Sequence, residues 1–192
     1  MKILLANKFY YRRGGDCIYT IHLEELLKAH GHEVAIFAMK HPDNLPNRWS
    51  CYWPDEIDFQ TPSDMMKTFA RPFGSKEVKR KFSKLLDDFC PDVVHANNIH
   101  SQLSPVIMEL AKKREIRTVW TLHDYKLLCP RYDCRRGTSA CELCFSSGIK
   151  NRSSALKNCI INRCIKGSVT ASLIGYGESL CRFQNEVQRF GI

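Results

Sequence analysis

The sequence contains no long apolar run, no internal repeat and no low-complexity segment. No stretch approaches the roughly 18 consecutive apolar residues of a membrane-spanning helix. A secretory signal needs an apolar core of about 7–15 residues, and the run Ile3–Ala6 is shorter than that. These absences exclude an integral membrane or secreted protein on sequence grounds, and we expect a cytoplasmic chain. With 44% apolar and 26% charged residues, the chain has the composition of a globular domain.

Acidic residues are scarce in the last part of the chain. Residues 112–192 hold 6 Asp+Glu and 15 Lys+Arg, whereas residues 1–111 hold 14 of each. The whole net charge of +9 therefore lies in the last 81 residues. This asymmetry predicts a polyanionic partner, namely nucleic acid, an anionic membrane surface or a phosphorylated substrate. A solvated basic face without a partner is the alternative.

Apolar periodicity predicts alternating strands and helices over the first 125 residues. We expect strands at 2–6, 33–38, 93–96 and 117–122, and helices from Asp16, over 75–90 and around 103–111. In the first helix, Tyr19, Leu23, Leu26 and Leu27 share the face expected to be buried, and Gly31 is expected to end it. Strands that alternate with helices indicate an α/β fold with a Rossmann-like parallel sheet flanked by helices.

The length of 192 residues predicts one domain, 1–192, with an appendage. Residues 41–63 contain four prolines and are expected to be irregular. Residues 126–167 have little periodicity and are interpreted as a cysteine-rich, loop-rich insertion, and 168–190 are expected to be helical again.

Polar residues follow three of the predicted strands. Asn7 and Lys8 follow the first, His95 and Asn97 lie at the end of the third, and His123-Asp124 follows the fourth. In an open parallel sheet, ligands bind outside the carboxyl ends of the strands, so these groups are expected at one edge. Turn chemistry that marks every strand end is the alternative.

Two further features of this edge point to substrate binding. Gly14-Gly15 precedes a predicted helix, whose N-terminus favours an anionic group, and Arg12 and Arg13 add positive charge. A tight turn explains the two glycines equally well. His123 can hydrogen-bond a ligand or move a proton near neutral pH, and a purely structural histidine is its alternative.

Six of the ten cysteines lie between residues 129 and 164. The pair Cys141-Glu-Leu-Cys144 has the spacing of a tetrahedral metal site. Clustered thiols in a reducing compartment suggest a structural zinc, for which we expect Cys129, Cys141, Cys144 and Cys164, with Cys159 as the substitute for Cys164. Free thiols and redox chemistry remain the alternatives, because a second CxxC is missing.

In combination these motifs are specific, and the chain resembles the N-terminal domain of family-4-like retaining glycosyltransferases of the GT-B fold. The matching pieces are Met1–Leu5, Asn7–Tyr11 with Gly14-Gly15, Gly31–Val34, Pro91–His95, Leu103–Pro105 and, most specifically, Thr121-Leu-His-Asp-Tyr-Lys-Leu-Leu-Cys-Pro130. A subset of that family has a similar cysteine-rich stretch. The chain would then be one half of a GT-B architecture, with the C-terminal donor-binding domain absent.

The resemblance implies a division of roles between residues. The glycine-rich loop near the donor phosphates corresponds to Gly14 and Gly15, and the histidine that contacts the transferred sugar corresponds to His123, beside Asp124. Arg12, Arg13, Lys126 and Arg131 would hold an anionic acceptor or leaving group, with His95 and Asn97 as further candidates. The chain departs from the family where Arg12-Arg13 replaces a common proline and where His95-Ala-Asn-Asn98 stands for His-x-His-Asn.

The resemblance predicts an acceptor-binding half that is inactive alone. Its partners would be a nucleotide-sugar donor, which needs the missing domain, a sugar or lipid-linked acceptor, a separate C-terminal half, and the inner membrane surface. The alternative functions are a basic, cysteine-rich nucleic-acid-binding module over 129–166, or a membrane-surface adaptor without catalysis. The segment lacks the interleaved aromatic residues of nucleic-acid-binding modules, which disfavours the first alternative.

Overall fold

The computed structural model describes residues 1–56, 75–100, 103–125, 129 and 131–142. The chain divides into two compact units, Met1–His123 and Asp124–Ile192. The predicted helix at 168–190 lies outside the described residues. Among the described residues, no helix has both the length and the apolar character needed to cross a bilayer.

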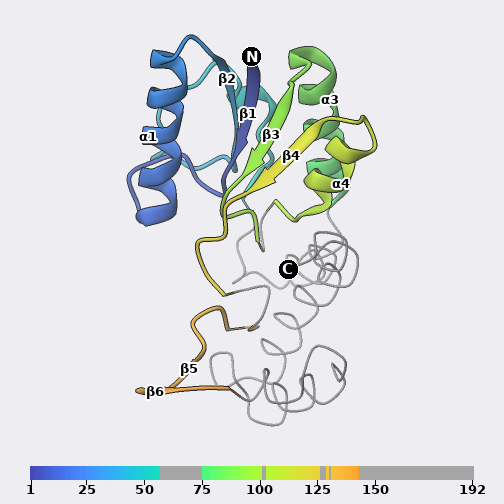
Figure 1. Ribbon diagram of the computed structural model, residues 1–192. Coiled ribbons are helices and arrows are strands. Elements are labelled where there is room, and N and C mark those ends of the chain that lie inside the picture. The colour runs from blue at the N-terminus through green and yellow to red at the C-terminus, as the bar shows by residue number, and fades with distance from the viewer. Residues whose placement is uncertain (57–74, 101–102, 126–128, 130, 143–192) are drawn as a thin grey trace. The chain divides into compact units, whose positions relative to one another are not determined.

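The first unit is built on a four-stranded parallel sheet with the order β2-β1-β3-β4 (Figure 1). Its strands are β1 (Lys2–Ala6), β2 (Glu33–Phe37), β3 (Val93–Ala96) and β4 (Arg117–Trp120). The register pairs Leu5 with Ile36 on one side and with His95 on the other. Both central strands are rich in fully buried aliphatic residues, as a sheet covered on both faces requires. The predicted α/β, Rossmann-like fold is confirmed.

Helices cover both faces of this sheet. Helix α1 (Gly15–Ala29) lies on one face, and α3 (Lys76–Phe89) and α4 (Val106–Lys112) lie on the other (Figure 1). Helix α3 is strongly amphipathic, because its five apolar residues repeat at helical spacing and all are buried. Its Phe82 ring meets Phe37 of β2 edge-on, with 4.9 Å between the centroids. Ser75 caps its N-terminus by accepting a hydrogen bond from the amide of Val78 at 3.1 Å.

The predicted buried face of α1 is confirmed for Leu23 and Leu27, which are half-buried against the core, and wrong for Tyr19 and Leu26. Leu26 is 56% exposed and Tyr19 is 39% exposed, whereas Cys17, Thr20, Ile21 and Glu24 are buried. The buried face contains two polar residues, and each has a partner there. Thr20 donates to the carbonyl of Asp16 at 2.8 Å, and Glu24 accepts hydrogen bonds from Tyr10 and Lys28. The helix ends as predicted, with Gly31 just beyond it at φ +78°.

The second unit contains a short antiparallel hairpin of β5 (Arg135–Arg136) and β6 (Ser139–Ala140) among its described residues. Gly137 turns the chain with φ +62°, a conformation that favours glycine. The hairpin falls inside the segment that was expected to be rich in loops. The amide of Cys141 donates to the carbonyl of Cys134 at 2.8 Å and extends the pairing beyond the two strands.

Candidate functional site

The loops that follow β1, β3 and β4 are joined at the carboxyl edge of the sheet. The Lys8 amide donates to the carbonyl of Asn98 at 2.8 Å, and the Asn7 side chain accepts from the Asn98 amide at 3.0 Å. The Thr121 amide donates to the carbonyl of Ala96 at 2.9 Å. The strand order changes direction between β1 and β3, which is where open parallel sheets form their ligand crevice.

Three residues from three different elements meet at this edge. His123 Nε2 lies 3.3 Å from Oδ1 of Asn97, in the loop after β3. The His123 ring also meets the ring of Tyr19 edge-on, with 5.1 Å between centroids. Tyr19 lies one turn into α1, four residues after Gly15, so the end of β4 lies near the start of α1. The apolar spacing of α1 predicted Tyr19 in the core, so its contact with His123 was not expected, although Tyr19 follows Gly15 by one helical turn.

His95 lies in β3, near His123. Its Nε2 lies 2.8 Å from the hydroxyl of Thr121, a second contact that the sequence analysis missed. Burial lowers the pKa of His95, and the nearby His123 lowers it further. His95 is therefore neutral at pH 7, and its contact with Thr121 joins β3 to the loop after β4.

The glycine-rich loop runs from β1 into α1. Gly14 is the N-cap in an extended conformation, and Gly15 is the first helical residue. Among the described residues, a Cβ added at Gly15 would meet no atom within 4 Å. Neither backbone geometry nor neighbouring atoms thus require glycine at position 15. The open space beside Gly15 can hold a ligand at the helix N-terminus. Arg12 and Arg13 are exposed on this loop, and the Arg13 guanidinium lies 4.8 Å from the centroid of Phe9.

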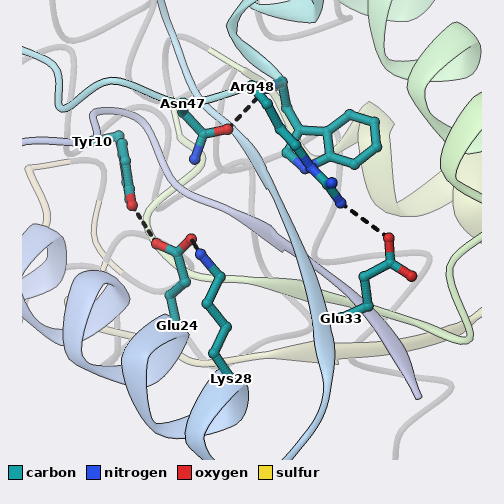
Figure 2. A network of polar contacts seen from close by, with 7 residues as sticks. Tyr10, Glu24, Lys28, Glu33, Asn47 and Arg48 are labelled. Carbon is teal, nitrogen blue, oxygen red and sulfur yellow. Dashed lines mark hydrogen bonds and ion pairs between the residues drawn. The ribbon is translucent and has the colours of Figure 1, made fainter.

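A buried polar network joins the same loop to α1 (Figure 2). The sequence pattern did not predict this network. The hydroxyl of Tyr10 donates to Glu24, whose other oxygen accepts from Lys28 at 2.7 Å. Glu24 is only 3% exposed. Burial and the hydrogen bond to Glu24 both raise the pKa of Tyr10, so the hydroxyl stays protonated and continues to donate.

The irregular segment after β2 forms a groove of about 490 Å³. Its lining includes Lys40, His41, Asn44, Asn47, Ser50 and Trp53. His41 stacks on Tyr11 from the β1 loop, with 4.7 Å between the centroids and 12° between the planes. The Asn44 side chain accepts from the amide of Tyr10 at 2.9 Å, so the groove wall and the β1 loop are rigidly joined.

Several predicted site residues belong to the second unit or lie outside the described residues. Asp124 begins the second unit. In that unit, Arg131 forms an ion pair with Asp133 at 2.9 Å. Lys126 lies outside the described residues. Within the first unit, the structure brings together Tyr19 near the start of α1, Asn97 and His123.

The predicted zinc ligands are only partly described. Cys144, Cys159 and Cys164 lie outside the described residues, whereas Cys129 and Cys141 lie within them. The described part of the chain contains no group of three or more metal-ligating side chains. Burial and the adjacent Cys129 raise the pKa of Cys134 to about 11, so this thiol is protonated at neutral pH. The zinc site stays a prediction.

Together, the fold and the site define a Rossmann-like domain whose polar groups converge at the carboxyl edge of a parallel sheet. The family model described as Glycosyltransferase Family 4 matches residues 13–143. That range includes Gly14, Gly15, Asn97 and His123. The chain belongs to glycosyltransferase family 4.

A protein of Klebsiella pneumoniae supports this assignment. It is described as an uncharacterized 42.6 kDa protein in the cps region, and it is 27% identical to this chain over 146 residues. The match covers 68% of this chain but only 38% of the relative. The chain therefore corresponds to less than half of that protein's length.

Proposed function

We propose that the chain is the N-terminal, acceptor-binding half of a retaining glycosyltransferase. The enzyme would transfer a sugar from a nucleotide-sugar donor to a polysaccharide or lipid-linked acceptor. The observation that carries the proposal is the meeting of the α1 N-terminus, Asn97 and His123 at one sheet edge, in a chain whose family is established. The cps-region relative supports a role in surface polysaccharide synthesis.

The chemistry of this edge suits sugar transfer from a diphosphate. The leaving diphosphate gains negative charge as the glycosidic bond breaks, and the N-terminus of α1 offers free amides and a positive dipole to it. Arg12 and Arg13 add positive charge on the same loop. His123 would contact the transferred sugar, and the groove after β2 would receive the acceptor beside the stacked pair Tyr11 and His41. The protein would thus act by positioning and by electrostatic stabilisation.

Replacing Gly15 with Ala tests the donor-phosphate site. Alanine is the better helix former, and its Cβ meets no described atom within 4 Å. The folded state should therefore be as stable as the parent, while the methyl group occupies the space proposed for phosphate. With the C-terminal half co-expressed, we expect weaker binding of UDP-sugars and GDP-sugars, measured by saturation-transfer NMR, and the unfolding midpoint of the chain should not change. Full binding by Gly15→Ala would place the phosphates elsewhere.

A transfer assay tests whether the chain is half of an enzyme. The purified chain should release no nucleoside diphosphate from UDP-hexoses or GDP-hexoses in the presence of membrane acceptors. Activity should appear when a separate Rossmann-like C-terminal half is co-expressed, and His123→Ala should abolish it. His30→Ala is the matched control, because His30 caps the opposite end of α1. Turnover by the chain alone would contradict the proposal.

We also propose that the second unit touches an anionic membrane, where lipid-linked acceptors reside. Arg135 and Arg136 of β5 are both exposed, and Tyr132 nearby is 56% exposed. Arginine with tyrosine is a typical pairing at a lipid headgroup layer. The Arg135→Gln/Arg136→Gln variant should float less with vesicles containing phosphatidylglycerol, whereas Lys79→Gln/Arg80→Gln, with the same loss of charge on α3, should not change. Equal flotation with neutral vesicles would refute this contact.

A further inference from the structure

Asn97 is held in place by contacts that do not involve its side chain. Its amide donates to the carbonyl of Ala6 at 2.8 Å, which ties it to the end of β1. Its carbonyl accepts from the indole of Trp120 at 2.9 Å, which ties it to the end of β4. The residue is 1% exposed. Asn97 is therefore fixed at the carboxyl edge of the sheet, between the ends of β1 and β4.

The contact between Asn97 and His123 determines where the imidazole proton lies. Oδ1 of Asn97 lies 3.3 Å from Nε2 of His123, and a carboxamide oxygen can only accept a hydrogen bond. With Oδ1 facing the ring in this way, Nε2 is the nitrogen that carries the proton. In the neutral ring, this leaves Nδ1 with a lone pair that can accept a hydrogen bond. The edge contact with Tyr19 restricts the ring from a second side.

The side-chain nitrogen of Asn97, Nδ2, has no hydrogen-bond partner among the described residues, and it is buried. Folded proteins pair nearly all buried polar groups, so an orphaned donor points to an oxygen supplied by a ligand. This edge of the sheet then offers a donor, Asn97 Nδ2, and an acceptor, His123 Nδ1. A sugar hydroxyl can satisfy both kinds of group.

We propose that Asn97 is a positioning residue that holds His123 in its Nε2–H tautomer, and that Asn97 Nδ2 and His123 Nδ1 together bind hydroxyl groups of the sugar. The sugar part of this inference rests on the proposed function. The tautomer does not, because it follows from groups within the chain alone. The two can therefore be tested separately.

The tautomer is measured on the full chain labelled with ¹⁵N-histidine, by long-range ¹H–¹⁵N correlation at low temperature near pH 8. His123→Gln identifies the signals of His123. We expect the ¹⁵N shifts of the Nε2–H tautomer. Asn97→Ala should lose this preference for Nε2–H, and Asn97→Asp should keep it because a carboxylate still accepts. A proton on Nδ1 in the parent chain, or an unchanged signal in Asn97→Ala, would overturn the proposal.

Asn98→Ala is the matched control for both measurements. Asn98 contacts its neighbours through its backbone, which the substitution preserves, so neither the tautomer nor binding should change. In saturation-transfer titrations with UDP-glucose and GDP-mannose, carried out with the C-terminal half co-expressed, Asn97→Asp should bind whichever nucleotide sugar the parent binds about tenfold more weakly, because the Nδ2 donor is gone. Equal binding would remove Nδ2 from the site. If the co-expressed halves transfer sugar but Asn97→Asp binds the donor as the parent does, the sugar-binding part fails and the proposed function stands, whereas absence of transfer contradicts the proposed function itself.

Discussion

Tyr10→Phe removes one hydroxyl from the buried network that joins the β1 loop to α1. The ring remains and still packs edge-on against Trp53, with 5.9 Å between the centroids. What is lost is the hydrogen bond to Glu24, a carboxylate that is 3% exposed. Lys28 remains as the second partner of Glu24, so the buried charge is still compensated. The substitution thus removes a charge-assisted hydrogen bond to Glu24 together with the hydrogen bond between the hydroxyl and Asn47.

A hydrogen bond to a charged group contributes about 1.5–3 kcal/mol, and burial removes the water that could replace it. We expect Tyr10→Phe to lower the free energy of unfolding by about 2 kcal/mol. The pH dependence should change as well. Because burial and Glu24 raise the pKa of Tyr10, the unfolded chain loses this proton first and stability falls as the pH rises above about 10. The phenylalanine variant should show a smaller loss in that range.

Urea denaturation followed by tryptophan fluorescence is suited to this measurement. All three tryptophans, at positions 49, 53 and 120, lie in the unit Met1–His123, so the signal reports on that unit alone. Tyr52→Phe is the matched control, since Tyr52 donates to Asp88 at 2.6 Å on the surface. Its effect should be much smaller, because water replaces an exposed hydrogen bond. Equal effects of the two substitutions would refute the argument from burial.

Three other substitutions test the fold. Ser75→Ala should cost about 1 kcal/mol by removing the N-cap of α3, as measured by the urea midpoint, while Ser83→Ala within the same helix should cost less. Phe82→Ala should cost about 3–5 kcal/mol, because the ring is fully buried against Phe37; a loss below 1 kcal/mol would mean that this site collapses without a cavity. The lowered pKa of His95 means that the unfolded chain takes up a proton before the folded one, so stability falls as the pH drops below about 6.5. His95→Gln should flatten that fall, and an unchanged pH profile would show that His95 is not protected from protonation.

The strands and α3 were predictable because local pattern and tertiary burial agree there. The four strands lie within two residues of the predicted ranges, since each is a short apolar run bounded by polar residues. Helix α3 buries the five residues that its spacing indicated, because all of its buried positions are apolar and none is taken by a polar residue. The convergence of the strand ends was likewise predictable, because parallel strands place their carboxyl ends at one edge.

Helix α1 and the detailed site were not predictable for a common reason. The carboxylate of Glu24 can be buried because Tyr10 and Lys28 both bind it, and Tyr19 lies outside the core, where it contacts His123. Such exchanges depend on partners that periodicity does not reveal. The contact of Asn97 with His123 spans 26 residues of sequence, and it exists only once β3 and β4 have paired. The groove after β2 belongs to an irregular segment that carries no periodic signal.

The central position of β1 has a consequence for how the protein folds. β1 pairs first with β2, about 30 residues later, but its other neighbour is β3, and the amide of Lys2 binds Asp92 across 90 residues of chain. The middle of the sheet is therefore closed by contacts of high sequence separation, which slow folding because a long loop must be ordered before they form. During synthesis, one side of β1 stays without its partner until β3 has left the ribosome. The crevice between β1 and β3, where Asn97 lies, is thus completed late in folding.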